Sequence, residues 1–169
     1  MIHQLIGQMK KQLGQLDHWL DAAETYAKDK KFEPNLVLSY RLAPDQYALV
    51  KQVQSACDTA KFAVARLAGK DAPSHPDTEA TLAELHARVR AVIEYLGSFA
   101  AADLAAAATR AIGLPRWEGK IMLGADYLVE HAIPNFFFHA THTYAILRHI
   151  GVPLGKRDFL GALTMHAPA

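Results

Sequence analysis

The residues best suited to chemistry lie in one segment near the end of the chain. Four of the nine histidines fall there, at His131, His139, His142 and His149. Imidazole is both a metal ligand and a base near neutral pH, and a pair three residues apart on a helix resembles a chelate. A helical-wheel projection at about 100° per residue argues against a chelate formed by these histidines. It places His131, His142 and His149 opposite the apolar centre of the helix, so we expect these three in solvent or at a subunit contact.

A small polar pocket is the alternative that the spacing favours. His139 and Asn135 lie four residues apart on the flank of the same predicted helix, where side chains can face a cleft. On an earlier helix Gln54 and Asp58 are also four apart. Gln54 lies at the edge of the apolar stripe, whereas Asp58 lies farther out, towards solvent. If Gln54 faces His139 across the bundle, these groups must satisfy one another or hold a metal.

Pro134 lies beside this predicted pocket and leaves two structures open. A proline inside a helix removes one backbone hydrogen bond and bends the axis, which would open a site next to Asn135 and His139. Alternatively Pro134 starts the helix proper, and residues 125–133 form a separate turn. The run Phe136-Phe137-Phe138 points in three directions on a helix, so we expect at least one ring to leave the core for a self-association surface.

Four helical segments must position these side chains. Apolar stripes at the helical period predict helices over residues 2–28, 44–68, 81–97 and 125–150. Thr81 and Glu84 have the form of a capping box, and Gly69 and Gly151 are typical of helix ends. Amphipathic helices of this length can hide their stripes only against one another, which predicts an all-α four-helix bundle over one domain, residues 1–169.

The connection before the fourth helix, residues 98–124, is the longest. Its alanine-rich part, 100–111, is compatible with one short helix. Residues 110–114 and 120–123 flank Pro115 to Gly119 and predict a small hairpin. This excursion is compatible with a lid over the pocket or with plain structural packing.

The composition of the 169-residue chain excludes several classes of protein. Eighteen basic and seventeen acidic residues leave a formal charge of +1, which argues against a nucleic-acid partner. Cys57 is the single cysteine, so there is no internal disulfide, and we expect it to be a buried, inert side chain. No run approaches 18 apolar residues and the N-terminus lacks a signal pattern, so we expect a cytoplasmic protein with no membrane association.

Familiar catalytic motifs are missing from the sequence. It contains no His-Glu-x-x-His, no glycine-rich phosphate loop and no Gly-x-Ser-x-Gly elbow. The duplicated Glu-x-x-His pairs of a di-iron bundle are also missing, so a di-metal oxidase is not expected.

Several motifs, in order, carry a resemblance to a known family. They are Arg41-Leu42-Ala43-Pro44-Asp45, Gln52-Val53-Gln54 with Asp58, Pro134-Asn135-Phe136 with Phe138-His139, Ala145-Ile146-Leu147-Arg148-His149 with Gly151, and Gly155-Lys156-Arg157-Asp158. The chain resembles a bacterial family known only as a domain of unknown function, within the DinB/YfiT-like superfamily of metal-dependent four-helix bundles. The resemblance covers nearly the whole chain. It implies an up-down-down-up bundle with one long connection, and a homodimer.

The resemblance also implies a metal site, from which this sequence departs. In the superfamily three histidines bind a divalent metal, which activates a low-molecular-weight thiol for transfer or isomerisation. The matching positions here are Gln54, Asn135 and His139, so one imidazole of three remains. Amides bind transition metals poorly compared with imidazole.

Two hypotheses about function follow. In the first, the protein is a degenerate thiol-transferase-like enzyme. His139 is then a metal ligand (zinc or nickel) or a general base, Asn135 and Gln54 support it, and Asp58 or Tyr40 lies nearby, with His131 at the pocket. In the second, the protein is a non-catalytic, dimeric bundle that binds a small molecule or serves a stress response. His139, Asn135 and Gln54 then form a satisfied hydrogen-bond network.

Overall fold

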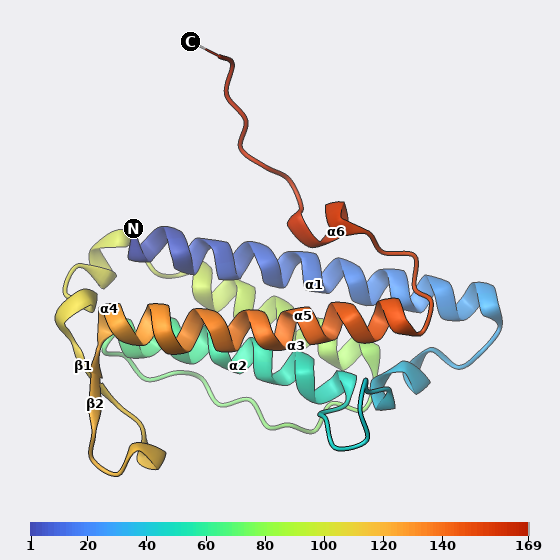
Figure 1. Ribbon diagram of the computed structural model, residues 1–169, viewed down its shortest axis with the longest axis horizontal. Coiled ribbons are helices and arrows are strands. Elements are labelled where there is room, and N and C mark those ends of the chain that lie inside the picture. The colour runs from blue at the N-terminus through green and yellow to red at the C-terminus, as the bar shows by residue number, and fades with distance from the viewer. Residues whose placement is uncertain (169) are drawn as a thin grey trace.

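The computed structural model describes residues 1–168 and contains four long helices packed side by side. They are α1 (Ile2–Lys30), α2 (Leu49–Ala68), α3 (Leu82–Gly97) and α5 (Ile133–His149). Helices α1 and α5 run in one direction along the bundle, and α2 and α3 run in the other (Figure 1). The predicted all-α, up-down-down-up bundle is confirmed.

The apolar stripes predicted from the sequence form the core. On α1, Met9, Leu13, Leu16 and Leu20 are fully buried, at spacings of three and four residues. Helix α2 packs most extensively against α5, and α1 packs most extensively against α3. Since each helix carries one apolar face, this arrangement removes all four stripes from water.

The ends of α2 and α3 are set by local signals in the sequence. Gly69 ends α2 with a left-handed φ of 68°, which glycine adopts without strain. The capping box of α3 is present: the Thr81 hydroxyl accepts from the Glu84 N–H at 3.2 Å, and the Glu84 carboxylate accepts from the Thr81 N–H at 2.9 Å. Between these ends, residues 69–81 run back along the bundle, so α3 starts at the same end as α2 (Figure 1).

Helix α2 begins at Leu49, five residues later than predicted. After η1 (Pro34–Ser39), a turn closes when the Gln46 N–H donates to the Ala43 carbonyl at 3.0 Å. Pro44 therefore occupies the second position of a β-turn, which its fixed φ also favours. Ala48 has extended backbone, and the Leu49 N–H donates to the Tyr40 carbonyl at 2.8 Å. This contact holds the chain extended until α2 starts.

The fourth long helix is continuous through Pro134. Helix α4 (Gly124–Asp126), the π-helical segment η5 (Tyr127–Ala132) and α5 follow one another without a break (Figure 1). Proline cannot donate to the carbonyl one turn earlier, and the wider turn of a π-helix accommodates that missing bond. Residues 125–133 are therefore continuous with α5, and Pro134 lies inside one long helix instead of starting it.

The excursion before this helix is a small hairpin at one end of the bundle. It comprises η2 (Ala101–Leu104), η3 (Ala107–Thr109), β1 (Ala111–Gly113), η4 (Pro115–Trp117) and β2 (Ile121–Leu123). The strands pair antiparallel, with Ala111 opposite Leu123, so the predicted hairpin is confirmed. The alanine-rich part forms two short 3₁₀ turns instead of one helix. A Cβ at Gly124 would lie 1.9 Å from the Ala107 carbonyl oxygen, so glycine permits this close approach.

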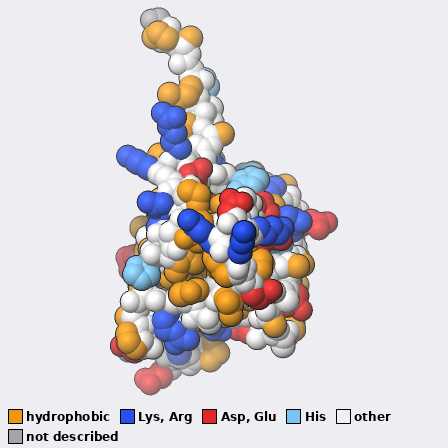
Figure 2. Space-filling view, turned by 90° about the vertical axis from the view of Figure 1, so that its right-hand side faces the viewer, with side chains coloured by type: hydrophobic (Ala, Val, Ile, Leu, Met, Phe, Trp, Pro, Cys, Tyr) orange, Lys and Arg blue, Asp and Glu red, His pale blue; other side chains and the backbone are white. Residues whose placement is uncertain are grey.

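The last helix is α6 (Lys156–Leu160), which packs on α1. The Trp19 indole donates to the Asp158 carbonyl at 2.9 Å, and the Trp19 and Phe159 rings stack at 5.4 Å. Residues 162–168 extend away from the bundle (Figures 1 and 2). Within residues 1–168, no single helix has the length and apolarity needed to cross a membrane; only α3 together with the bent segment Ala101–Thr109 meets that test, as a pair.

Candidate functional site

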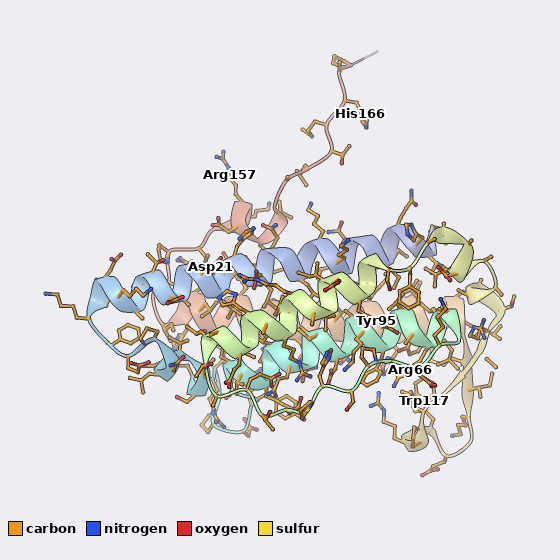
Figure 3. The ribbon with its side chains drawn as sticks, turned by 180° about the vertical axis from the view of Figure 1, so that it is seen from behind. Asp21, Arg66, Tyr95, Trp117, Arg157 and His166 are labelled. Carbon is orange, nitrogen blue, oxygen red and sulfur yellow. The ribbon has the colours of Figure 1, made fainter. Side chains whose placement is uncertain are left out.

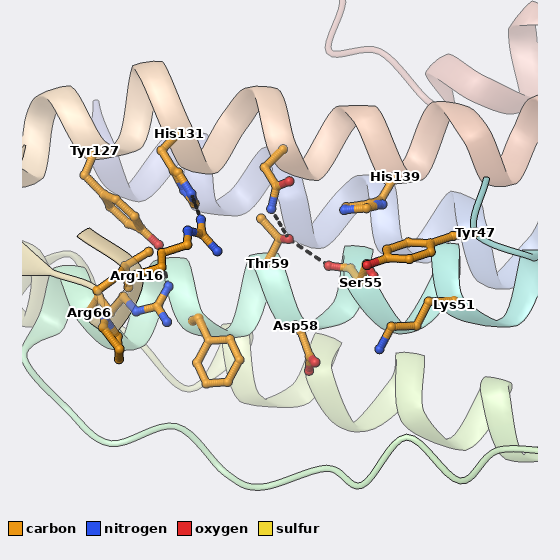
Figure 4. A pocket seen from close by; sticks show the side chains of 14 residues that line it. Tyr47, Lys51, Ser55, Asp58, Thr59, Arg66, Arg116, Tyr127, His131 and His139 are labelled. Atoms are coloured by element: carbon orange, nitrogen blue, oxygen red, sulfur yellow. Dashed lines mark hydrogen bonds between the residues drawn. The ribbon is translucent and has the colours of Figure 1, made fainter. Parts of the chain in front are cut away.

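An elongated groove of about 520 Å³ lies between α2 and the helix formed by η5 and α5. The wall from α2 and the segment before it consists of Tyr47, Lys51, Ser55, Asp58, Thr59, Phe62 and Arg66; the opposite wall consists of Tyr127, His131, Asn135 and His139; and the hairpin adds Leu114, Pro115 and Arg116 (Figure 4). Spacings of three and four residues place the α2 side chains on one face. At 1.5 Å per residue, Lys51 and Arg66 are about 22 Å apart along the axis.

One end of the groove is organised around His139. Its Nδ1 lies 2.8 Å from Gln52 Oε1, and the Gln52 amide nitrogen donates to the Tyr47 carbonyl at 3.3 Å. The Gln52 oxygen therefore accepts, and Nδ1 carries the imidazole proton. Within residues 1–168, Nε2 forms no hydrogen bond, and it is the nitrogen left to face the groove (Figure 4). The Tyr47 ring lies parallel to the imidazole, with ring centres 6.4 Å apart.

The protonation state of His139 follows from its surroundings. Burial, and to a smaller degree the charges of His142 and Lys51, lower the pKa of His139 to about 4. The imidazole is therefore neutral at physiological pH. Its Nε2 presents a lone pair that accepts a hydrogen bond from whatever occupies the groove.

Asn135 joins the two walls in the middle of the groove. Its amide nitrogen donates to the Thr59 hydroxyl at 2.8 Å, and that hydroxyl donates to the Ser55 carbonyl at 2.7 Å (Figure 4). These two hydrogen bonds fix the Asn135 side chain of α5, because the Thr59 hydroxyl and the Ser55 carbonyl both belong to α2. The amide oxygen is the part of Asn135 that remains for a ligand.

The hairpin end of the groove is basic. Arg66 donates to the Tyr127 hydroxyl at 3.0 Å, and Arg116 contacts His131 Nε2 at 2.5 Å. The imidazole stacks on Tyr127, with ring centres 5.3 Å apart. Burial, followed by the charges of Arg116 and Arg66, lowers the pKa of His131. A neutral His131 accepts from Arg116 through Nε2, so its proton lies on Nδ1.

Two residues of α2 that were predicted for the site, Asp58 and Gln54, have partners outside the groove. Asp58 lines the groove, but its carboxylate accepts from Lys61 and Arg88, both at 2.8 Å. The Gln54 amide donates to Glu79 at 2.8 Å. Gln54 follows Gln52 by two residues, about 200° around the helix, so it cannot face His139 as well. Gln52 holds the position against His139 that the sequence assigned to Gln54.

Four of the six predicted site residues line the groove, namely His139, Asn135, Asp58 and His131. Gln54 and Tyr40 do not. Tyr40 is an exposed residue at the end of η1; because α2 starts late, Tyr47 is the tyrosine that reaches His139. The underwound η5 segment places His131 at the groove, although a regular helical projection turns it away.

Sequence reasoning missed Gln52, Arg66 and Arg116 as site residues. A signal for the α2 wall was available: polar or aromatic residues recur along one face at Lys51, Ser55, Thr59, Phe62 and Arg66. Arg116 had no such signal, because the position of a hairpin relative to a helix does not show in a periodicity.

The superfamily metal does not fit the side chains assembled here. Gln54 lies on another face of α2, the Asn135 amide is engaged by Thr59, and His139 is the one imidazole among these three matching positions. In the part of the chain that the structure describes, no three histidine, cysteine, aspartate or glutamate side chains are grouped to hold a metal ion. Cys57 offers no thiolate, because burial raises the pKa of its thiol to about 12.

Comparisons with known proteins agree with this fold. A search of curated proteins gives no match. The chain is similar to a crystal structure of a DinB family member protein from Shewanella denitrificans, with 50% sequence identity and a TM-score of 0.96, over 99% of this chain and 96% of that one. The model of the family described as Domain of unknown function (DUF1993) matches residues 1–160. The chain therefore belongs to the DUF1993 family, with the DinB-like bundle that the motifs of its sequence predicted.

Proposed function

We propose that this protein binds a small molecule in the groove between α2 and α5 without a metal ion. The observation that carries the proposal is the contact between Gln52 and His139. It fixes a neutral imidazole with Nδ1 towards the core and Nε2 towards the groove. A hydrogen-bond acceptor held in this way, beside the parallel ring of Tyr47, suits a ligand that presents an N–H or O–H group.

The donor set favours this function over a metal-dependent thiol transferase. That chemistry needs a metal held by several strong ligands, and the positions that match the superfamily's ligands supply one imidazole, His139, and one amide oxygen, that of Asn135. The other imidazole of the groove, His131, is engaged by Arg116. The DinB-like fold does not decide the matter, because one fold serves many functions.

A catalytic role for His139 as a general base has one specific observation in its favour. The Gln52 oxygen orients the imidazole, as the third member of a catalytic triad does. However, a neutral amide does not stabilise an imidazolium as a carboxylate does. A pKa of about 4 also makes His139 a weak proton acceptor at neutral pH. Binding is therefore the function that the geometry supports better.

The dimer expected from the sequence stays a prediction. Of the three consecutive phenylalanines, Phe136 is buried, Phe137 is half-buried and Phe138 is 52% exposed. The expectation that one ring leaves the core is thus met. Phe138 lies on the outer face of α5, where a second copy could cover it.

A ligand screen on metal-free protein tests the proposed function. Tag-free protein is treated with a chelator and screened by ligand-observed NMR against small polar compounds, both anionic and neutral. Each hit is then measured with Gln52→Met, which releases His139, and with Gln54→Met as the matched control on the other face of α2. We expect hits that bind without metal and bind more weakly to Gln52→Met than to Gln54→Met. Binding that appears only after zinc or nickel is added, or a screen without hits, would contradict the proposal.

A further inference from the structure

The two arginines at the hairpin end of the groove have no carboxylate partner in residues 1–168. Arg66 contacts the Tyr127 hydroxyl, and its guanidinium carbon lies 4.8 Å from the centre of the Phe62 ring. Arg116 contacts the neutral His131. Both side chains therefore bring a full positive charge to one part of the groove, and their protein contacts there are to neutral groups.

The rest of the groove does not neutralise these charges. Asp58 is the one acidic residue in its described lining, and its carboxylate is already shared by two buried cations, Lys61 and Arg88. Lys51, at the other end, is paired with Asp77. The groove thus carries an excess of positive charge, which is concentrated at Arg66 and Arg116 (Figure 4).

The remaining N–H groups of the arginines point to what would offset this charge. A guanidinium has five N–H donors in a planar fork that matches the oxygens of a carboxylate or phosphate. Each arginine makes one side-chain hydrogen bond within the groove, so most of its donors remain free for a ligand. Two like charges at one end of a partly enclosed site repel each other, and an anion between them replaces that repulsion with two attractions.

We propose that the ligand of the groove carries a carboxylate or phosphate group, which Arg66 and Arg116 hold at the hairpin end. The inference rests on the proposed function and names the chemical class of its ligand. The rest of the ligand extends towards Nε2 of His139. His131 and His139 are eight residues apart, about 12 Å along the helix, so a compact metabolite spans both ends.

Trp117 offers a local signal for binding at this end. Its ring centre lies 5.6 Å from that of His131 and 6.4 Å from that of Tyr127, and it lies at the same end of the bundle as Arg66 (Figure 3). The other tryptophan, Trp19, is fully buried beside α6. A fluorescence change that disappears in Trp117→Phe therefore reports on the hairpin end of the groove.

The experiment titrates metal-free protein with two matched pairs of probes, succinate against succinamide and glycerol 3-phosphate against glycerol. Comparing the two anions separates a carboxylate site from a phosphate site. Arg66→Gln and Arg116→Gln remove the charges under test. Lys120→Gln is the control, because it removes one charge from the same hairpin outside the groove.

We expect saturable binding of at least one anion and none of its neutral partner. Binding should weaken about tenfold or more in each arginine variant, remain unchanged in Lys120→Gln and fall with added salt. Equal binding of charged and neutral probes would overturn the inference but leave the proposed function intact. Equal binding to wild type and both arginine variants, or no saturable change with either anion, would also overturn it; the proposed function would then depend on the hits of the wider screen.

Discussion

Helix α2 presents polar side chains on two faces, and the two faces differ in whether their charged side chains have partners of opposite charge. Towards α3 and residues 69–81, Asp58, Lys61, Arg88 and Glu79 form a network in which every charge contacts an opposite one. Towards α5, Arg66 and Arg116 contact neutral groups. On the first face every charge is paired within the protein. On the second face the arginine charges would be paired only by a bound anion.

Burial explains why the first face had to be complete. The side chains of Lys61 and Arg88 are 1% and 2% exposed, and a cation at that depth is strongly destabilising unless it is paired. The groove is open to solvent, so water can hydrate its arginines when no ligand is bound. The paired face therefore stabilises the fold, while the unpaired face is free to bind.

The largest effect that separates the two faces is expected for Arg88→Met. The substitution keeps much of the side-chain volume but leaves Asp58 and Glu79 without their buried partner. We expect the free energy of unfolding, measured with urea, to fall by about 3–5 kcal/mol. A fall below about 1 kcal/mol would mean that this network is not structural.

A smaller effect is expected from the pH dependence of stability at His139. Its folded pKa of about 4 lies below the ordinary 6.5, so the unfolded chain takes up the proton first as pH falls. The neutral His139 side chain therefore makes its full contribution to the free energy of unfolding above pH 6.5. As the pH falls towards 4, the free energy of unfolding decreases by roughly 1–3 kcal/mol. The measurement is the free energy of unfolding across this range for wild type and His139→Gln. A difference between the two proteins that does not change with pH would contradict the assignment.

The helices and their faces could be predicted from the sequence, because apolar spacing fixes which side of each helix is buried. Which polar residue meets which neighbour could not. Gln52 and Gln54 lie on opposite faces of α2, and the choice between them depends on how far α2 is rotated against α5. Two local features also escape a regular helical projection. The turn at Pro44 delays the start of α2 and brings Tyr47 to the groove. The π-helical segment before Pro134 changes the direction of His131 and brings it there as well.

The smallest effect on stability is expected for Arg116→Gln. This residue lies on the exposed hairpin and has no charged partner in the described chain, so its loss removes a repulsion as well as a hydrogen bond. We expect the free energy of unfolding to change by no more than about 0.5 kcal/mol, in either direction. Urea unfolding alongside Arg88→Met provides the contrast. A loss comparable to that of Arg88→Met would make the basic end of the groove structural.

The metal content of the protein tests the central claim most directly. Tag-free protein is dialysed against zinc and then nickel, freed of excess metal, and analysed by elemental mass spectrometry beside His139→Ala. A metal-free binding groove predicts far less than one equivalent of either metal, at the same level in both proteins. Near-stoichiometric metal that is lost in His139→Ala would show that His139 anchors a metal site, and would contradict the account.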